Sequence, residues 1–193
     1  MAVVARDVAY LKEGLGELPE PVARPVLIVV SGLPGTGKSH FSRKLSERLP
    51  CVIVESDAQR KRLFSSPSYS SGESQRLFAA CHRLIEDLID AGVTTVLDAT
   101  NLVEHHRERL YHIADRLRAK LIVVRLEAPQ WLVHERLQGR MRCVAADDNS
   151  EADWAVYQRM TGKAEAIRRN YYAVDTSGDI NPAIDKIVRE AKR

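Results

Sequence analysis

Eight consecutive residues constrain this chain more than any other feature of its sequence. The pattern GxxxxGK[ST] occupies residues 32–39, directly after the apolar run 26–31 and directly before a helical stretch over 39–49. Its three glycines allow backbone conformations that other residues avoid, so successive N–H groups can converge on one anion at the start of a helix. The pattern predicts a phosphate-binding loop formed by Gly32, Leu33, Pro34, Gly35, Thr36, Gly37, Lys38 and Ser39.

The polar side chains of this loop have separate expected roles. Lys38 can reach the β- and γ-phosphates of a nucleotide, and the Ser39 hydroxyl is a suitable ligand for Mg²⁺. Thr36 can add a hydroxyl contact. The structural alternative is a glycine-rich turn that only joins a strand to a helix, but the full motif in this setting favours a nucleotide site. We expect ATP as the phosphate donor, although the sequence alone does not distinguish ATP from GTP.

Apolar runs alternate with amphipathic helical stretches along the chain, which predicts a parallel sheet covered by helices on both faces. Apolar residues recur at helical spacing over 77–89 and 110–117, and we assign those faces to the core. The fold class is α/β, with one domain over residues 25–193 and an N-terminal appendage over residues 1–24. The expected strands are rich in Val, Ile and Leu, as buried parallel strands are, and span 26–31, 52–55, 94–98, 121–126 and 173–175.

Composition narrows the protein class further. Hydrophobic residues make up 45% and charged residues 28% of the 193, which is typical of globular proteins. The apolar runs are too short to cross a bilayer and the N-terminus lacks the features of a signal peptide, so we expect a cytoplasmic protein without membrane contact. Three widely spaced cysteines indicate neither disulfides nor a zinc site. The net charge of +3 suits a phosphorylated ligand but is not decisive, and no obligate protein partner is indicated.

A carboxylate follows the second expected strand, where open α/β sheets hold their ligands. Asp57 can act there as a general base that takes the proton of an attacking hydroxyl, and Arg60, one helical turn on, can hold an acceptor phosphate. The alternative is structural: Ser56-x-x-Gln59 reads as a capping box, and an acid in the first turn offsets the helix dipole.

The third expected strand also ends in polar residues. Asp98 occupies the position of a Walker B acid, which can hold Mg²⁺ through water. We assign Asn101 to the acceptor side together with Asp57 and Arg60. The alternative for this segment is a helix cap made by Asn101 with Glu104.

A helical lid is predicted over about residues 136–165. Arg136 and Arg140 are four residues apart on one helix face and can bring positive charge to the nucleotide phosphates after closure. A turn over 141–150 should precede a helix capped by Ser150-x-x-Asp153, and the aromatic residues of that helix should pack against its partner. A serine-rich segment, residues 65–74, is predicted to form a mobile surface loop.

Taken together, these motifs resemble the P-loop kinases of the zeta-toxin and polynucleotide-kinase-like group, which carry ATP-binding domains of the AAA type. The resemblance covers about residues 26–187. It implies a P-loop NTPase sheet of strand order 2-3-1-4-5 with a helical lid. In phage polynucleotide 5′-kinase, a D-x-x-R pair that matches Asp57 and Arg60 serves the acceptor. The resemblance also implies a lid arginine on the ATP phosphates, matched here by Arg140 or Arg136. Besides the loop, the resemblance is carried by residues 56–60, 96–101, 135–140, 153–157 and 174–177.

The same scaffold carries gluconate kinase, chloramphenicol phosphotransferase and toxins that phosphorylate sugar nucleotides, so the fold does not choose the acceptor. We predict an ATP-dependent kinase that transfers the γ-phosphate to a hydroxyl, with the 5′-hydroxyl of a polynucleotide as one candidate. The alternatives are a small-molecule kinase acting on a sugar, antibiotic or sugar nucleotide, and a nonkinase ATPase or nucleotide-sensing binding protein. A basic strip leading away from the acceptor site would favour nucleic acid, whereas a closed pocket would favour a small molecule.

Overall fold

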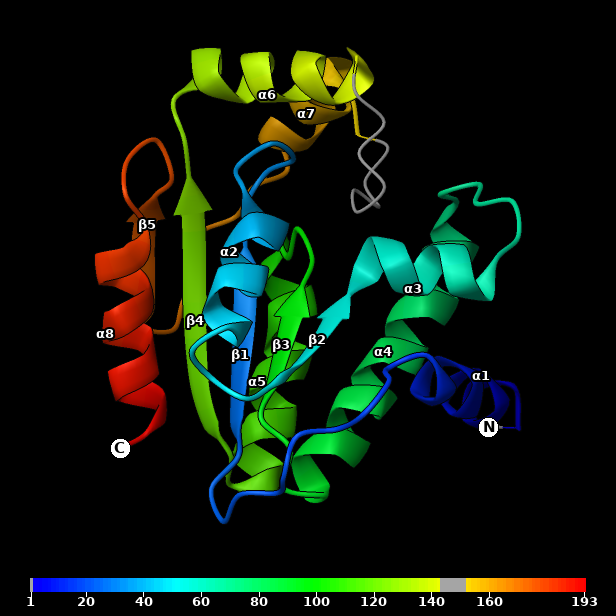
Figure 1. Cartoon of the computed structure of the whole chain (residues 1–193). Helices are drawn as coiled ribbons and strands as arrows, with labels where there is room; N and C mark the ends of the chain where they lie inside the picture. Colours follow the sequence, from blue (N-terminus) through cyan, green and yellow to red (C-terminus); the bar gives the residue numbers. More distant parts are fainter. Residues whose placement is uncertain (1, 143–151) are drawn as a thin grey trace.

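A five-stranded sheet of order β2-β3-β1-β4-β5 forms the centre of the molecule, as the computed structural model in Figure 1 shows. The structure describes residues 2–142 and 152–193. All neighbouring strands pair in parallel, so the fold class and the strand order implied by the resemblance are confirmed. The strands are β1 (Val26–Ser31), β2 (Val52–Glu55), β3 (Thr95–Asp98), β4 (Lys120–Glu127) and β5 (Tyr171–Asp175).

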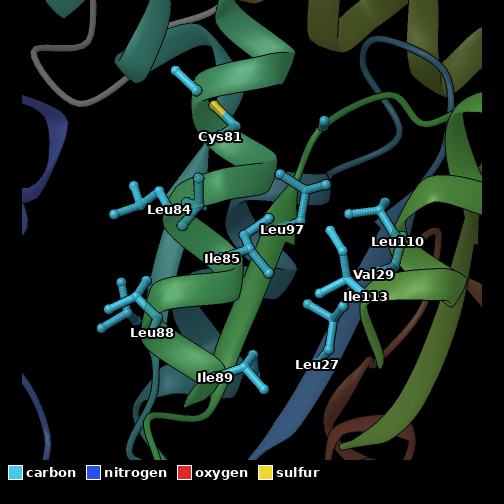
Figure 2. Close-up of a cluster of buried hydrophobic side chains, with 14 of the residues drawn as sticks. Leu27, Val29, Cys81, Leu84, Ile85, Leu88, Ile89, Leu97, Leu110 and Ile113 are labelled. Carbon is cyan, nitrogen blue, oxygen red and sulfur yellow. The ribbon is translucent and has the colours of Figure 1, made fainter. Parts of the chain in front are cut away.

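Helices cover both faces of the sheet because side chains of a strand alternate between faces. Leu27 and Val29 of β1 belong to one buried cluster, whereas Ile28 and Val30 belong to the cluster on the opposite face. Figure 2 shows the first cluster, in which side chains of α4 and α5 face β1 and β3. The second cluster contains side chains of α2 and α8. These helices are α2 (Lys38–Ser46), α4 (Ser71–Asp90), α5 (Glu104–Leu117) and α8 (Asn181–Ala191).

The N-terminal segment, expected as an appendage, shares the core of the domain. Helix α1 (Ala2–Glu13) packs against α4 and against α3 (Ser56–Leu63), beside the sheet edge formed by β2 (Figure 1). Val8 and Leu11 are buried in the first cluster. Asp7 accepts hydrogen bonds of 2.7 Å from Nε and Nη2 of Arg76, which fixes α1 on α4.

The serine-rich segment over residues 65–74 forms a shorter loop than predicted, because its last residues are helical. Helix α4 begins at Ser71, inside the predicted loop, because Ser70 serves as its N-cap and accepts a hydrogen bond from the Glu73 N–H. The Glu73 carboxylate in turn accepts hydrogen bonds from the N–H and the hydroxyl of Ser68. These local bonds define the conformation of the segment that leads into α4.

Two helices lie across the carboxyl ends of the strands (Figure 1) and correspond to the predicted lid: α6 (Gln130–Arg142) and α7 (Trp154–Thr161). Val133, Leu137 and Tyr157 form a small buried cluster to which Leu33 of the phosphate-binding loop contributes. Trp154 stacks on Tyr157, with 4.8 Å between ring centroids. Most of the turn predicted over 141–150, including the expected cap Ser150, lies outside the described residues. Asp153 itself caps α7, because its Oδ1 accepts the Val156 N–H at 2.8 Å.

Candidate active site

The loop between β1 and α2 has the geometry that its glycines predict. Gly35 and Gly37 adopt φ values of +79° and +82°, in the left-handed region that favours glycine. A Cβ on Gly32 would lie 2.8 Å from the backbone oxygen of Leu126, so the loop passes too close to β4 for a larger residue. Thr36 Oγ1 donates a 2.8 Å hydrogen bond to the Leu33 carbonyl, which makes Thr36 a brace of the loop.

Lys38 lies at the centre of the candidate site. Its Nζ donates a 3.0 Å hydrogen bond to the Leu33 carbonyl of the same loop. Burial lowers the pKa of Lys38, the Asp98 and Asp57 carboxylates act to raise it, and Arg140 acts to lower it. Asp57, Asp98 and Arg140 therefore share one electrostatic neighbourhood with Lys38, although up to 102 positions separate them in sequence.

The parallel register brings these groups to one edge of the sheet. Asp98 pairs with Val30 on β1 and with Glu55 on β2, so the carboxyl ends of three strands lie level with one another. The phosphate-binding loop follows β1 after Ser31, and Asp57 stands in the first turn of α3, directly after β2. The structure thus brings these residues together at the strand ends, where open α/β sheets hold their ligands, and their roles stay predictions.

Asp98 and Ser39 fit a magnesium ion. Burial raises the pKa of Asp98, while Lys38 and a hydrogen bond from Ser39 lower it. Within the described residues, Oδ2 of Asp98 is buried and has no hydrogen-bond partner. A buried carboxylate oxygen beside a hydroxyl is a suitable donor set for Mg²⁺, which prefers oxygen ligands and keeps several waters.

The capping box weighed for Ser56 with Gln59 and the helix cap weighed for Asn101 with Glu104 do not occur in the structure. Helix α3 has Glu55 as its N-cap and α5 has Val103, and neither residue makes a side-chain capping bond. In the part of the chain that the structure describes, the Gln59 Oε1 that would complete the box has no hydrogen-bond partner. Asp57 is half-buried and acts on Lys38. Offsetting the helix dipole remains compatible with its place in the first turn.

Arg60 is less accessible than its expected role requires. It is 5% exposed and forms an ion pair with Glu73. Its Nη2 donates to the Ser74 hydroxyl at 3.3 Å, and the guanidinium lies 4.8 Å from the centroid of the Tyr69 ring. The structure therefore places Arg60 between α3 and the start of α4, where it holds the acceptor-side helix. Direct contact with an acceptor remains a prediction.

Asn101 braces the strand that carries the loop. Its Nδ2 donates a 2.7 Å hydrogen bond to the Val30 carbonyl, and its own carbonyl accepts one from the Ser31 hydroxyl at 3.1 Å. The buried Arg107 guanidinium donates to the same carbonyl. The bond to Val30 uses one of the two Nδ2 hydrogens, so the other hydrogen and Oδ1 of the Asn101 side chain remain for an acceptor.

Arg136 connects the lid to the loop through Thr176, which sequence reasoning did not select. Arg136 donates from Nη1 to Thr176 Oγ1 at 2.9 Å and from Nη2 to the Thr176 carbonyl at 2.7 Å. Thr176 Oγ1 donates at 3.0 Å to the carbonyl of Thr36. The only sequence signal for Thr176 was its place in the 174–177 segment of the resemblance. Arg140, one helical turn beyond Arg136, is the lid arginine whose charge reaches Lys38.

Other kinds of site receive no support within residues 2–142 and 152–193. These residues contain no group of three or more His, Cys, Asp or Glu side chains that could hold a metal ion. No helix among them is long and apolar enough to span a membrane. The predicted cytoplasmic location stays a prediction.

Comparison with known families decides the classification. A family model described as an AAA domain matches residues 27–167. The chain belongs to this AAA domain family. The match contains the phosphate-binding loop, Asp57, Asp98 and both lid arginines, and it confirms the P-loop kinase-like resemblance.

The relatives of this AAA domain protein include a KTI12 homolog and a tRNA kinase. The Protein KTI12 homolog of Rattus norvegicus is 26% identical over 168 residues, covering 83% of this chain and 48% of that protein. The L-seryl-tRNA(Sec) kinase of Methanococcus maripaludis is 26% identical over 116 residues, covering 58% of this chain and 44% of that protein. The chain thus spans about half the length of the curated relatives it matches.

Solved structures share the fold. Kti12 of Chaetomium thermophilum, in complex with ADP-AlF3, superposes with a TM-score of 0.69 at 20% identity, covering 86% of this chain and 98% of that chain. The Mycobacterium tuberculosis APS kinase, in complex with AMPPNP and APS, also has a TM-score of 0.69, at 13% identity, and covers 90% of this chain and all of that chain. At these identities the likeness shows a P-loop kinase-like fold and nothing more specific.

Proposed function

We propose that this AAA domain protein is an ATP-dependent phosphotransferase that moves the γ-phosphate of ATP to a hydroxyl group. The observation that carries the proposal is the arrangement around Lys38: a carboxylate on the acceptor side, Asp57, and a lid arginine, Arg140, both act on the loop lysine. A nucleotide-binding module needs the loop but has no need of a base beside it. The named relative that is a kinase supports the same reading.

The residues divide the work as follows. Backbone N–H groups of residues 32–39 would bind the phosphates at the start of α2, and Lys38 would leave the Leu33 carbonyl for the β- and γ-phosphates. Ser39 and, through water, Asp98 would hold Mg²⁺, which when bound neutralises charge on the phosphates. Arg136, already held by Thr176, would border the nucleotide on the lid side.

The reaction requires one proton transfer. As the acceptor oxygen attacks the γ-phosphorus and the bond to the ADP oxygen breaks, Asp57 would accept the hydroxyl proton. Arg140 would stabilise the charge that spreads over the transferred group. Arg60 would act indirectly, since its ion pair with Glu73 fixes the helix that carries Asp57.

Asp57→Asn tests the proposal. Asparagine keeps the size of the side chain but cannot accept the proton, so transfer should fall about a hundredfold or more while ATP binds as before. ATP affinity is measured by calorimetry and transfer by radiolabelled ATP, with oligonucleotides, sugars, nucleosides and antibiotics as acceptors. Near wild-type transfer by the variant would remove the catalytic role of Asp57. A wild-type protein that binds ATP but phosphorylates none of these acceptors would instead favour a nonkinase ATPase or nucleotide-sensing protein.

A further inference from the structure

Helices α1 and α3 together present two arginines and a tyrosine to solvent, and we call Arg6, Tyr10 and Arg62 the α1–α3 strip. Arg6 and Tyr10 are four residues apart on α1 and so share a helix face. Tyr10 is 47% exposed, and the Arg62 guanidinium lies 4.7 Å from the centroid of its ring. Arg62 Nε also donates a 3.1 Å hydrogen bond to the Tyr10 carbonyl, so the strip is a joint feature of both helices.

The two guanidinium groups of the strip face solvent. Arg6 and Arg62 are both exposed. The charge of Arg6 acts on Asp7 and helps to lower its pKa, and Arg62 contacts the carbonyl and the ring of Tyr10. Asp7 itself is buried, and its two oxygens accept hydrogen bonds from Arg76, so Arg6 and Arg76 share this one acid. Arg6, Arg62 and Arg76 with Asp7 carry a net charge of about +2 at neutral pH. The charges of the neighbouring exposed pair, Lys12 and Glu13, cancel. The strip therefore keeps a net positive charge beside an exposed aromatic ring.

A cavity of about 320 Å³ opens on this strip. Its walls combine a ring, a guanidinium plane and an apolar side chain, which are the surfaces on which proteins stack unpaired bases. Its lining residues are Arg6, Asp7, Tyr10, Leu63 and Arg76.

The strip leads away from the candidate general base. Asp57 stands in the first turn of α3 and Arg62 in the last, which separates them by about 7.5 Å along the helix axis. Helix α1 lies beyond α3 on the side away from β1 (Figure 1). Helix α1, with Arg6 and Tyr10, lies outside the residues that the family model matches, 27–167, whereas Arg62 lies inside them.

We propose that the α1–α3 strip binds a single-stranded polynucleotide, whose terminal hydroxyl reaches Asp57. Arg6 and Arg62 contact phosphates, and Tyr10 stacks on a base. A small acceptor would not extend to α1. An acidic peptide offers carboxylates to the arginines, whereas a polynucleotide repeats a phosphate and a flat base at every unit, which suits arginines placed beside an exposed ring. The claim that the terminal hydroxyl is phosphorylated at Asp57 rests on the proposed kinase function. The claim that the strip binds a polynucleotide does not depend on that function.

Fluorescence anisotropy with a labelled single-stranded oligonucleotide, as RNA and as DNA, measures the binding without ATP. Affinity falls as salt rises, and each phosphate contact makes the slope of log affinity against log salt steeper by about 0.7. The double variant Arg6→Ala with Arg62→Ala should therefore have a slope that is shallower by about 1.4. Tyr10→Ala should weaken binding roughly fivefold to a hundredfold through lost stacking. Arg189→Ala with Lys192→Ala is the matched control, because it removes two exposed positive charges from the other edge of the sheet (Figure 1).

The outcomes separate the strip from the reaction. Arg62 contacts α1, so thermal melting checks each variant, and the exposed single variants at Arg6 and Tyr10 still test the strip should the double variant not fold. Absence of oligonucleotide binding at low salt, equal weakening by the control, or tighter binding of polyglutamate would each overturn the proposal. Asp57→Asn should bind the oligonucleotide as the wild type does. Oligonucleotide binding along the strip without any phosphate transfer would support the binding proposal and contradict the kinase function.

Discussion

Gly35→Ala tests whether the lid packs on the phosphate-binding loop. An alanine at φ +79° adopts the left-handed conformation at a cost of about 1–2 kcal/mol. Its Cβ would lie 2.8 Å from Val133 Cγ1 and 3.1 Å from Leu137 Cγ, and such overpacking costs about 1–3 kcal/mol. The free energy of unfolding should therefore fall by about 2–5 kcal/mol.

Gly139→Ala is the matched control on the lid helix itself. Gly139 lies within α6, has no positive φ, and a Cβ there meets nothing within 4 Å. The same chemical change should raise the free energy of unfolding by about 1 kcal/mol through helix propensity. Urea denaturation measures both variants, and for a chain of this size each kcal/mol shifts Tm by about 2–4 °C.

A double-mutant cycle isolates the contact between lid and loop. Val133→Ala alone should destabilise by removing buried methyl groups, but combined with Gly35→Ala it also removes the closest clash. The two effects should thus be less than additive, by about 0.5–3 kcal/mol. Strict additivity would mean that α6 does not rest on the loop, and it would refute the geometry on which the lid assignment depends.

Further variants test single groups. Lys38→Ala should abolish ATP turnover and weaken ATP binding in calorimetry; no change in either would exclude a working loop. Arg140→Ala should reduce the single-turnover rate more than ATP affinity, and the reverse pattern would make it a ground-state contact. Thr176→Val removes the hydroxyl that bonds to the Thr36 carbonyl, so it should raise KM for ATP and lower the free energy of unfolding by about 1–3 kcal/mol. Steady-state kinetics and a thermal melting curve of the variant measure the two effects. Burial lowers the pKa of His82 from 6.5 to about 4, so the folded state binds fewer protons than the unfolded state between these values. The free energy of unfolding should therefore fall as the pH drops from 6.5 toward 4. In His82→Gln this fall should be smaller, which urea denaturation at several pH values would measure.

The sheet and the loop could be predicted from sequence because local patterns determine both. Each buried strand appears as a short apolar run, and the family resemblance supplied the order of the strands. The loop is a contiguous motif whose glycines have backbone angles that other residues avoid. The position of Asp57 and Asp98 beside Lys38 follows from the rule that strand ends of a parallel sheet share one edge.

The partners of Arg60 and Arg136 could not be predicted, because they depend on side chains distant in sequence. Glu73 pairs with Arg60 across 13 residues, and its segment looked like a simple polar loop. Thr176, which directly follows β5, accepts a hydrogen bond from Arg136, 40 residues earlier, and the composition of this segment gives no sign of that contact. Helical periodicity placed Arg136 and Arg140 on one face, but it could not show that one is held by the β5 end and the other acts on Lys38.

The buried clusters separate the nucleotide side of the molecule from the acceptor side. Helix α2, which follows the loop, packs with α8 in the cluster on one face, and α6 with α7 forms a small cluster with the loop. Helix α3, which carries Asp57, is backed by α1 and α4 in the cluster on the opposite face. The cluster that contains α4 also contains Leu27 and Val29 of β1, the strand that leads into the phosphate-binding loop. Changes in α1, which packs on α3 and α4, should therefore reshape the acceptor side with less effect on the loop than changes in α4. A fold arranged in this way can keep one donor site while its acceptor surface differs between chains, and α1, which lies outside the matched residues 27–167, packs on the helix that carries Asp57.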